Sequence, residues 1–293
     1  MYIIESIVYG LPQGAMYGLM AFGISLIFKT FGALNFSHGY AGMISTFVAL
    51  TIYIRTENLI ISILGALIFA FIMGIMIEKI LMRKIKKASA GSMLIMTLGL
   101  LMIYEGLALL IWGPDFQIFP PIYDGNPLII DRGELFIFLE SNDIIKAIIA
   151  LVVTVSLAVF LKFTKMGTAI RARSQDEVGA KVVGIDVNKT DMIVWGIGIT
   201  LTALVGILVA NKENLYPTMM INYQLFGFTA GVLGGFSNPF GAIVGGLILG
   251  VLEQFVANNL SPDYQLSIIL ILIIVVLVVK PSGIFGKAFE GRV

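Results

Sequence analysis

Long apolar runs separated by short polar connections dominate this sequence and restrict the folds open to it. Apolar residues make up 58% of the chain, charged residues 13%, and the mean hydropathy is +0.97. Soluble domains have about 45–50% apolar and about 25% charged residues. A helix needs about 20 apolar residues to cross ~30 Å of hydrocarbon. Segments of this kind are residues 6–28, 38–55, 59–78, 91–112, 143–161, 190–210 and 264–280.

Residues 221–257 add one or two more spans. The sequence therefore predicts an all-α integral membrane protein, a polytopic helical bundle with about eight or nine spans, some of them broken helices. No connection is long enough for a separate soluble domain, so we expect residues 1–293 to form one transmembrane domain. No Lys or Arg precedes the first run and no small-residue cleavage site ends it, so we expect it to stay in the mature protein.

Basic residues gather in three connections, and short basic loops are retained on the cytoplasmic side of a membrane. The connection 113–143 is acidic instead, with one Arg, and we expect it to face outward. We therefore expect a multi-pass protein of the cell membrane with the three basic regions inside. The basic residues are Lys79, Arg83, Lys84, Lys86 and Lys87, then Lys162, Lys165, Arg171, Arg173, Lys181 and Lys189, then Lys280, Lys287 and Arg292; the acidic ones are Asp115, Asp124, Asp131, Glu134, Glu140 and Asp143.

Glycines recur every four residues in the first span and in residues 227–250. This spacing places them on one helix face, where the missing side chain lets another backbone approach closely. Ordinary packing within the subunit and a subunit interface or moving seam both fit the pattern. The glycines are Gly10, Gly14 and Gly18, then Gly227, Gly231 and Gly235, then Gly241, Gly245, Gly246 and Gly250.

The stretch 32–40, "GALNFSHGY", is the most polar interruption near a span and holds the only histidine. Irregular backbone at membrane depth persists only inside protein or beside water. We therefore predict a helix break here, with Ser37 as the N-cap of the next helix. The new helix start suits a carboxylate or another polar solute, which makes Asn35, Ser37, His38 and Gly39 candidates for a translocation path. Alternatively, these residues only satisfy the broken backbone or form a cytoplasmic surface turn.

Residues 36–41 resemble residues 236–241 at an offset of 200, and each begins a helix rich in small residues. Repeats built around broken helices occur in transporters, where paired interruptions mark the pathway. Gly234, Gly235 and Asn238 are therefore further path candidates.

Glu105 lies in the middle of a predicted span, where a charge costs about 2.5–3.5 kcal/mol on insertion scales. It is either a pathway or gating residue or a hydrogen-bonding acid inside the bundle. Glu253, the other acid of this kind, lies nearer a helix end.

Catalytic motifs are missing from the sequence. There is no cysteine, one histidine gives no metalloprotease spacing, and no nucleophile elbow partners it. The pair Gly286-Lys287 lacks the other residues of a nucleotide-binding loop. We therefore expect no catalytic residue, no metal site and no cofactor on this chain.

The second basic connection, about residues 162–190, contains a segment that favours a short amphipathic helix. From Thr168 to Val183 the alanines are spaced among charges, and Gly184 follows as a glycine C-cap. Such a helix at the cytoplasmic mouth could dock into a partner, while a charge-rich loop is equally compatible with a solvated connection.

Four blocks of the chain together resemble a known family. Gly167, Arg171-Ala172, Gln175-Asp176, Ala180 and Gly184-Ile185-Asp186 resemble the ATPase-coupling loop of ABC importer permeases of the branched-chain amino acid type. The other blocks are "GLPQGAMYGLMAFGISLIFKTFGALNFSHGYAGM", "GVLGGFSNPFGAIVGGLILGVLE" and "KPSGIFG". Their order runs from about residue 10 to 286, and the Asn-x-Ser-His-Gly form at residues 35–39 is more similar to LivH-like permeases than to LivM-like or sugar permeases. Tyr40 departs from the family, which usually has an acid there.

The resemblance implies one half of the translocation path of an importer driven by separate subunits. It implies a homologous second permease, two cytoplasmic ATPase subunits that bind ATP with Mg²⁺, an extracytoplasmic solute-binding protein, a small polar solute and surrounding lipid, with no nucleic acid. The residues carried over to ATPase coupling are Arg171, Asp176, Glu177, Ala180 and Gly184.

Other functions stay open at this point. Permeases for urea, amides or other amino acids resemble the 35–39 block too. An ion-coupled secondary transporter would use Glu105 as its proton or cation site, and a membrane scaffold would need only the glycine faces.

Overall fold

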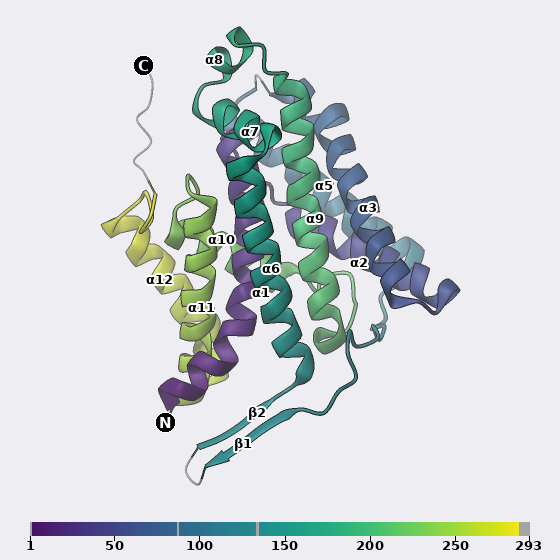
Figure 1. Ribbon diagram of the computed structural model, residues 1–293, viewed down its shortest axis with the longest axis vertical. Helices are drawn as coiled ribbons and strands as arrows, with labels where there is room; N and C mark the ends of the chain where they lie inside the picture. The colour runs from purple at the N-terminus through teal and green to yellow at the C-terminus, as the bar shows by residue number, and fades with distance from the viewer. Residues whose placement is uncertain (1, 87, 133–134, 287–293) are drawn as a thin grey trace. The chain divides into compact units, whose positions relative to one another are not determined.

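Helices make up nearly all of the computed structural model, which describes residues 2–86, 88–132 and 135–286 (Figure 1). Lys87, Glu134, Lys287 and Arg292, used above for topology, lie outside these residues. The longer helices are α1 (Tyr2–Phe31), α2 (His38–Thr56), α3 (Leu59–Ile77), α5 (Ala90–Trp112), α6 (Ser141–Phe163), α9 (Val187–Glu213), α10 (Ile221–Gly234), α11 (Pro239–Asn259) and α12 (Gln265–Val279). Shorter elements are η1 (Glu78–Met82), α4 (Arg83–Ile85), α7 (Lys165–Gln175), α8 (Glu177–Val182), η2 (Pro262–Tyr264), β1 (Leu128–Arg132) and β2 (Leu135–Leu139).

The chain divides into two compact units, and each is described by itself. The first unit comprises Met1–Ser25, Pro121–Val152 and Tyr223–Val293, and the second comprises Leu26–Pro120 and Val153–Asn222. The expectation that all 293 residues act as one transmembrane domain stays a prediction.

The predicted spans correspond to helices in every case. Seven helices of the described chain are long and apolar enough to cross a membrane, which agrees with a polytopic all-α protein. They do not include α2, although it matches the predicted span 38–55, nor α10, whose 14 residues are too few to cross alone. The count of eight or nine spans is therefore not confirmed. Both predicted helix breaks are present, between α1 and α2 and between α10 and α11.

In the first unit, the glycine faces bring the backbones of α1 and α11 together. A Cβ atom added at Gly10 would lie 2.6 Å from the carbonyl oxygen of Gly250, and one at Gly14 would lie 2.8 Å from that of Gly246. Gly245 likewise faces the backbone of Ala230 on α10. These contacts lie within the subunit, as the ordinary packing interpretation predicted, because only glycine permits backbones this close.

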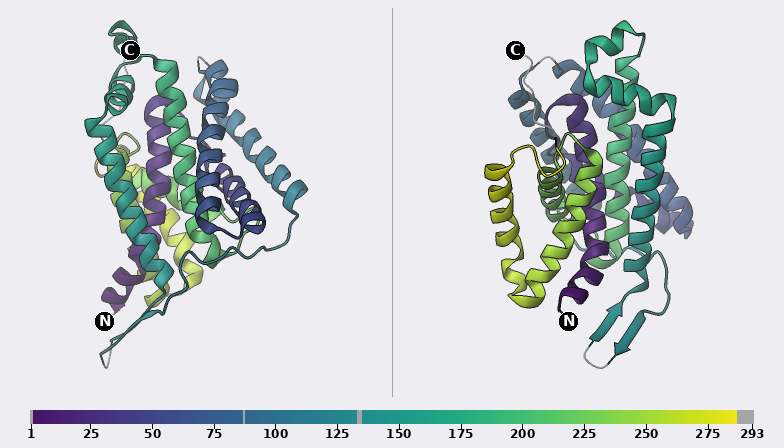
Figure 2. Two further views of the ribbon diagram at one scale, coloured as in Figure 1. Left: turned by 45° about the vertical axis from the view of Figure 1, so that its right-hand side comes forward. Right: turned by 60° about the vertical axis from the view of Figure 1, so that its left-hand side comes forward.

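In the second unit, α2, α3 and α9 pack on one another and α5 packs on α2. The indole of Trp112 stacks on Phe47 with ring centroids 4.9 Å apart and donates a 2.9 Å hydrogen bond to the hydroxyl of Thr51. Gly42 on α2 faces the backbone of Thr202 on α9. Figure 2 shows α3 and α5 diverging from their connection at one end.

Three local structures differ from the sequence-based expectation. The outer connection contains a β-hairpin, in which β1 and β2 pair antiparallel and the backbone N–H of Phe138 donates to the hydroxyl of Tyr9 at 2.8 Å (Figure 2). The end of α3 widens into the π-helix η1, which inserts one extra residue per turn. The strands were not predicted because apolar and polar residues alternate only weakly in "LIIDR" and "LFIFL". The π-helix was not predicted because the periodicity of apolar residues does not distinguish a single π-turn from the α-helix around it.

The single helix predicted from Thr168 to Val183 is wrong, because the segment forms two helices. Asp176 ends α7 with extended backbone angles (φ −151°, ψ 109°), and its side chain then caps α8 by accepting from the N–H of Val178 at 3.1 Å. A short acidic side chain competes with the helix backbone in this way and favours a new start.

Candidate functional site

The break between α1 and α2 is built on the side chain of Asn35. Gly32 ends α1 in the left-handed region (φ +72°), donating its N–H to the carbonyl of Phe28 at 2.7 Å. The Oδ1 atom of Asn35 accepts from the N–H of Ser37 at 3.0 Å and from its hydroxyl at 2.7 Å. Ser37 is the N-cap residue of α2 as predicted, but its hydroxyl goes to Asn35 and does not cap the helix.

This break is buried, which does not fit an exposed surface turn. Asn35 is 2% exposed, and Ser37 and His38 are fully buried, as is Gly39. Neither ring nitrogen of His38, nor Nδ2 of Asn35, has a hydrogen-bond partner among the described residues. Some polar atoms of the cluster are therefore not used in satisfying its own backbone within the described residues, and a role in the translocation path stays a prediction.

Glu105 of α5 belongs to the same unit and is half-buried. The hydroxyl of Tyr40, in the first turn of α2, hydrogen-bonds to the Glu105 side chain. The tyrosine at which this chain departs from the family pattern is therefore a partner of its mid-span acid. This geometry fits the interpretation of Glu105 as a hydrogen-bonding acid inside the bundle. A role of Glu105 in the pathway or in gating stays a prediction.

The candidates Gly234, Gly235 and Asn238 lie in the first unit, where they contact the C-terminal segment. The N–H of Phe285 donates to the carbonyl of Gly234 at 3.2 Å, and Nδ2 of Asn238 donates to the carbonyl of Phe285 at 3.4 Å. A Cβ at Gly235 would lie 2.6 Å from Cα of Gly286. The structure therefore brings two of the family-like blocks together, "GVLGGFSNPFG" and "KPSGIFG", at the end of α10.

Glu253 takes part in a polar network that the sequence did not indicate. The hydroxyl of Tyr17 donates to Oε2 of Glu253 at 2.8 Å, and Nε2 of Gln13 donates to the hydroxyls of Tyr17 and Tyr223 at 3.0 Å each. The network links α1, α10 and α11 in the first unit. Pairing of this kind offsets the cost of placing a carboxyl group within apolar helices.

We call α7 and α8 together the coupling segment. Its second helix, α8, ends in a glycine C-cap at Gly184. The N–H of Gly184 donates to the carbonyl of Lys181 at 3.1 Å, and that of Ile185 to Ala180 at 2.9 Å, with Gly184 in the left-handed region (φ +83°). This is the Schellman arrangement, which favours glycine at that position. Ala180 is 3% exposed and faces inward, whereas Gly184 is exposed. The predicted glycine C-cap is confirmed.

Arg171 lies apart from the other predicted coupling residues. Its Nη1 atom donates to the carbonyls of Leu161 and Lys162 at 2.7 and 3.2 Å, at the end of α6. A cation at a helix C-terminus satisfies the last carbonyls and interacts favourably with the helix dipole. In this structure Arg171 therefore joins α6 to α7.

A cluster of ion pairs holds the coupling segment against the rest of the second unit. Asp191, in the second turn of α9, bonds Arg173 of α7 at 2.9 Å and Lys86 at 2.7 Å. Glu177 of α8 bonds Lys86 at 3.0 Å, Arg173 at 3.2 Å and Lys181 at 2.8 Å. Asp191 and Arg173 are nearly buried, with side chains 1% and 6% exposed. We call these five residues the coupling cluster.

Within the coupling cluster, the neighbours of Glu177 change the pKa of its carboxyl group. Desolvation raises its pKa, but hydrogen bonds from Lys181 and Lys86 and the charge of Arg173 outweigh this and lower the pKa to about 2. Two of the predicted inner loops, the one after α3 and the one between α6 and α9, meet in this cluster, in agreement with their assignment to one side of the membrane.

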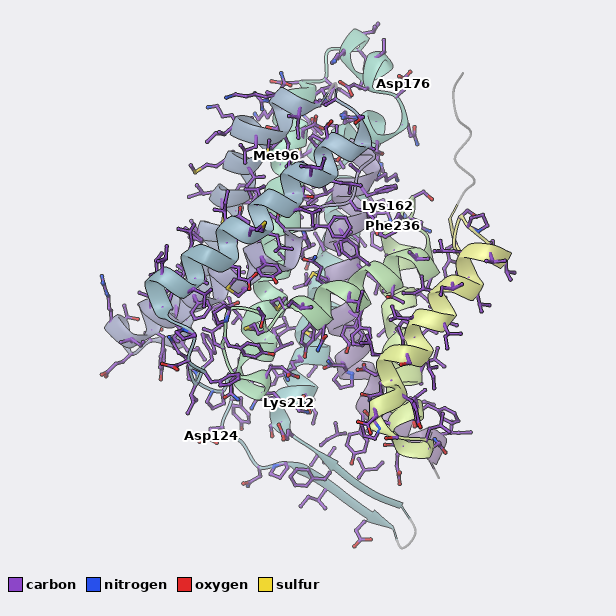
Figure 3. All side chains as sticks on the ribbon, turned by 180° about the vertical axis from the view of Figure 1, so that it is seen from behind. Met96, Asp124, Lys162, Asp176, Lys212 and Phe236 are labelled. Atoms are coloured by element: carbon purple, nitrogen blue, oxygen red, sulfur yellow. The ribbon has the colours of Figure 1, made fainter. Side chains whose placement is uncertain are left out.

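Sequence reasoning selected Glu177 but missed Lys86, Arg173 and Asp191. The i, i+4 spacings of Arg173, Glu177 and Lys181 are visible in the sequence and predict pairs along one helix face. The pairs to Asp191 and Lys86 join distant segments and have no local signal. Figure 1 shows α7 and α8 beside the start of α9, and Asp176, labelled in Figure 3, lies where α7 gives way to α8.

Comparisons with known proteins show which family this chain belongs to. Residues 6–277 match the family model described as "Branched-chain amino acid transport system / permease component". The chain belongs to this family. A match over nearly the whole chain makes it a transport component and a multi-pass membrane protein, in agreement with its seven membrane-scale helices.

Relatives of this permease cover it almost end to end. It is 27% identical to the high-affinity branched-chain amino acid transport system permease protein LivH of Salmonella typhimurium, over 98% of this chain and 96% of that protein. It is 26% identical to BraD of Pseudomonas aeruginosa, over 97% and 96%. It is 25% identical to the probable LivH of Methanocaldococcus jannaschii, over 92% and 88%. No solved structure matches the permease.

Proposed function

We propose that this permease is the membrane-spanning subunit of an ABC importer for branched-chain amino acids, forming half of the translocation path. The observation that carries the proposal is the family match over residues 6–277, together with relatives named for branched-chain amino acid transport along nearly their whole length. The partners would be a homologous second permease, two cytoplasmic ATPases carrying ATP with Mg²⁺, and an extracytoplasmic solute-binding protein.

The segment α7–α8 is suited to receive mechanical work from an ATPase. Three valines of α8 and its C-cap are largely exposed: Val178 (70%), Val182 (81%) and Val183 (74%). They lie on a segment that the basic residues place on the cytoplasmic side, where apolar side chains without a cover suit a protein partner. We assign ATPase docking to this surface, which we call the α8 valine surface.

The remaining predicted coupling residues support the α8 valine surface from behind. Asp176 and Gly184 fix the start and end of α8, Ala180 packs it inward, and Glu177 ties it to the coupling cluster. A push on α8 would reach α9 through Asp191 because ion pairs of 2.7–3.2 Å leave little room for independent movement. We assign ATPase coupling to these residues and give Arg171 the separate role of joining α6 to α7.

The alternative functions have less support. A permease for urea, amides or other amino acids would share the family, but LivH and BraD are named for branched-chain amino acids. An ion-coupled transporter would use Glu105, but the partner that the structure gives this carboxyl group is the hydroxyl of Tyr40, and a hydroxyl is not the second acid of a proton relay. A scaffold would leave the α8 valine surface without a purpose.

The test is ATP-driven uptake in proteoliposomes that contain the permease, its second permease, the ATPases and the binding protein. We expect leucine uptake that depends on ATP and on the binding protein. Val182→Ser with Val183→Ser should reduce uptake strongly while the helical content and melting temperature stay unchanged. Lys189→Ser, also exposed in this connection, is the matched control and should have no effect. Uptake driven by an ion gradient without nucleotide would overturn the proposal.

A further inference from the structure

A small cavity in the second unit is lined by residues from the break after α1 and by Trp195 of α9. Its lining includes Phe31, Asn35, Met82, Met93, Thr97 and Trp195. The cavity measures about 10 Å³, which is close to the smallest space that holds one water molecule. Met82 ends η1 and Met93 lies in the first turn of α5, so the cavity lies near the basic connection between those helices.

Two residues that line this cavity each have a buried polar atom without a hydrogen-bond partner among the described residues, and both atoms are donors. Nδ2 of Asn35 and Nε1 of Trp195 are buried and make no hydrogen bond to any described residue, and the two residues are each 2% exposed. The indole nitrogen can only donate. Leaving such donors unpaired in an apolar interior is unfavourable, so a cavity lined by two residues with unpaired donors indicates a ligand that accepts hydrogen bonds.

The orientation of the Asn35 amide is fixed by its neighbour. The backbone N–H of Ser37 can only donate, and it lies 3.0 Å from the atom assigned as Oδ1. A flipped amide would place two donors against each other, so the NH₂ group must be the end that is free to donate. The Trp195 ring is held in turn by Phe31, with centroids 5.5 Å apart and planes at 89°.

We propose that this cavity is a subsite for the carboxylate group of the transported amino acid, a role that rests on the proposed function. A carboxylate oxygen accepts from Asn35 Nδ2 and Trp195 Nε1, and charge-assisted bonds of this type are about twice as strong as neutral ones. The Lys86 ammonium lies over the Phe31 ring, 5.8 Å from its centroid, but it is already paired with Asp191 and Glu177, so the two neutral donors carry the recognition. A carboxylate needs a larger cavity than this one, and two of the lining side chains, Met82 and Met93, are unbranched methionines that adapt readily to make room.

The sequence offers a direct probe because the chain has only two tryptophans. Trp112→Phe keeps the apolar stacking on Phe47 and leaves Trp195 as the sole indole. In this background, the full chain in lipid nanodiscs is titrated with leucine and with 3-methylbutylamine, which is leucine without its carboxylate. We expect leucine to change the Trp195 emission saturably and the amine to have no effect. No response to leucine, or an equal response to both, would show that the cavity holds water only and would overturn the proposal.

Asn35→Asp is the sharpest variant, because one carboxylate oxygen can keep both bonds from Ser37 while the donor becomes a negative acceptor. Its half-saturating leucine concentration should rise at least about tenfold. If this variant does not fold, Trp195→Phe replaces it, since a phenylalanine ring carries no unpaired donor. Leucine should then raise the melting temperature of the native chain and not that of Trp195→Phe, and equal shifts would count against the proposal.

Failure of the subsite and failure of the proposed function give different results. If the unmodified importer shows ATP-driven leucine uptake while Asn35→Asp and Trp195→Phe transport normally, the subsite is wrong and the proposed function stands. If the unmodified importer carries no leucine at all, the proposed function itself is wrong.

Discussion

Replacing Asp191 by alanine should destabilise the permease far more than any other single change in the coupling cluster. Asp191 is the shared partner of Arg173 and Lys86, at 2.9 and 2.7 Å. Its removal leaves the Arg173 guanidinium, 6% exposed, without its main counter-ion. Breaking a buried ion pair from one side costs about 3–5 kcal/mol, because an uncompensated charge stays buried.

Lys181→Ala is the matched control, because it removes a charge from the same cluster at an exposed position. Lys181 pairs with Glu177 at 2.8 Å but is 58% exposed, so its loss should cost about 0.3–0.5 kcal/mol. Thermal unfolding of the detergent-solubilised chain, followed by tryptophan fluorescence, compares the two. Equal melting temperatures for Asp191→Ala and Lys181→Ala would refute the reasoning, since they would mean that the Asp191 pairs are not buried.

A double substitution then separates stability from coupling. Replacing a buried ion pair by apolar residues of similar volume is often neutral or stabilising, so Arg173→Met with Asp191→Leu should recover most of the lost stability. Lys86 keeps its 3.0 Å contact with Glu177 in this variant. If the pairs transmit movement from α8 to α9, ATP hydrolysis should continue while leucine uptake falls. Uptake equal to that of the unmodified importer would show that these charges only stabilise the fold.

Three further predictions test other features. Gly14→Ala places a Cβ 2.8 Å from a backbone oxygen and should destabilise the chain by about 1–3 kcal/mol, whereas Gly106→Ala, with no atom within 4 Å, should stabilise it by up to about 1 kcal/mol; unfolding measurements that rank them the other way would contradict the α1–α11 contact. The lowered pKa of Glu177, about 2 against 4.5, gives stability that is fully present above pH 4.5 and lost as the pH falls towards 2; Glu177→Gln should flatten stability over that window, and an unchanged pH profile would exclude the pairing. Val182→Cys, introduced into a chain without cysteine, should react with an impermeant maleimide only in inside-out vesicles, and reaction in intact cells would reverse the topology.

Helix positions could be predicted from the sequence because the bilayer fixes their length. The span predicted at 91–112 agrees with the bounds of α5 to within one residue. The spacing of the glycines in α1 predicted the close backbone contacts that α1 makes with α11. Breaks at residues 32–37 and 235–238 followed from polar and glycine-rich interruptions. These features depend on residues that are neighbours in the chain, so the sequence alone is enough to predict them.

The parts that could not be predicted depend on pairs of distant residues. Asp191 meets Lys86 across 105 positions, and nothing near either residue marks the other. Trp195 lies within the predicted span 190–210, and only the fold places this residue at the same cavity as Asn35. The division of the coupling segment at Asp176 was missed for another reason: its alanines and charges suit one helix as well as two, and a single side-chain cap decides between them.

The position of Arg83 and Lys86 relative to α9 depends on how many residues the π-helix η1 contains, and not only on which residues they are. Each residue turns an α-helix by about 100°, so the extra residue in Glu78–Met82 rotates everything after it by that amount. Arg83 and Lys86 then reach the carbonyl of Asn188 and the carboxylate of Asp191 at the start of α9. Deleting Ile80 alone keeps every charge in the chain, yet it would aim both cations at a different neighbour. In this permease the loss of one codon can therefore disconnect two segments although every charged residue that joins them is still present.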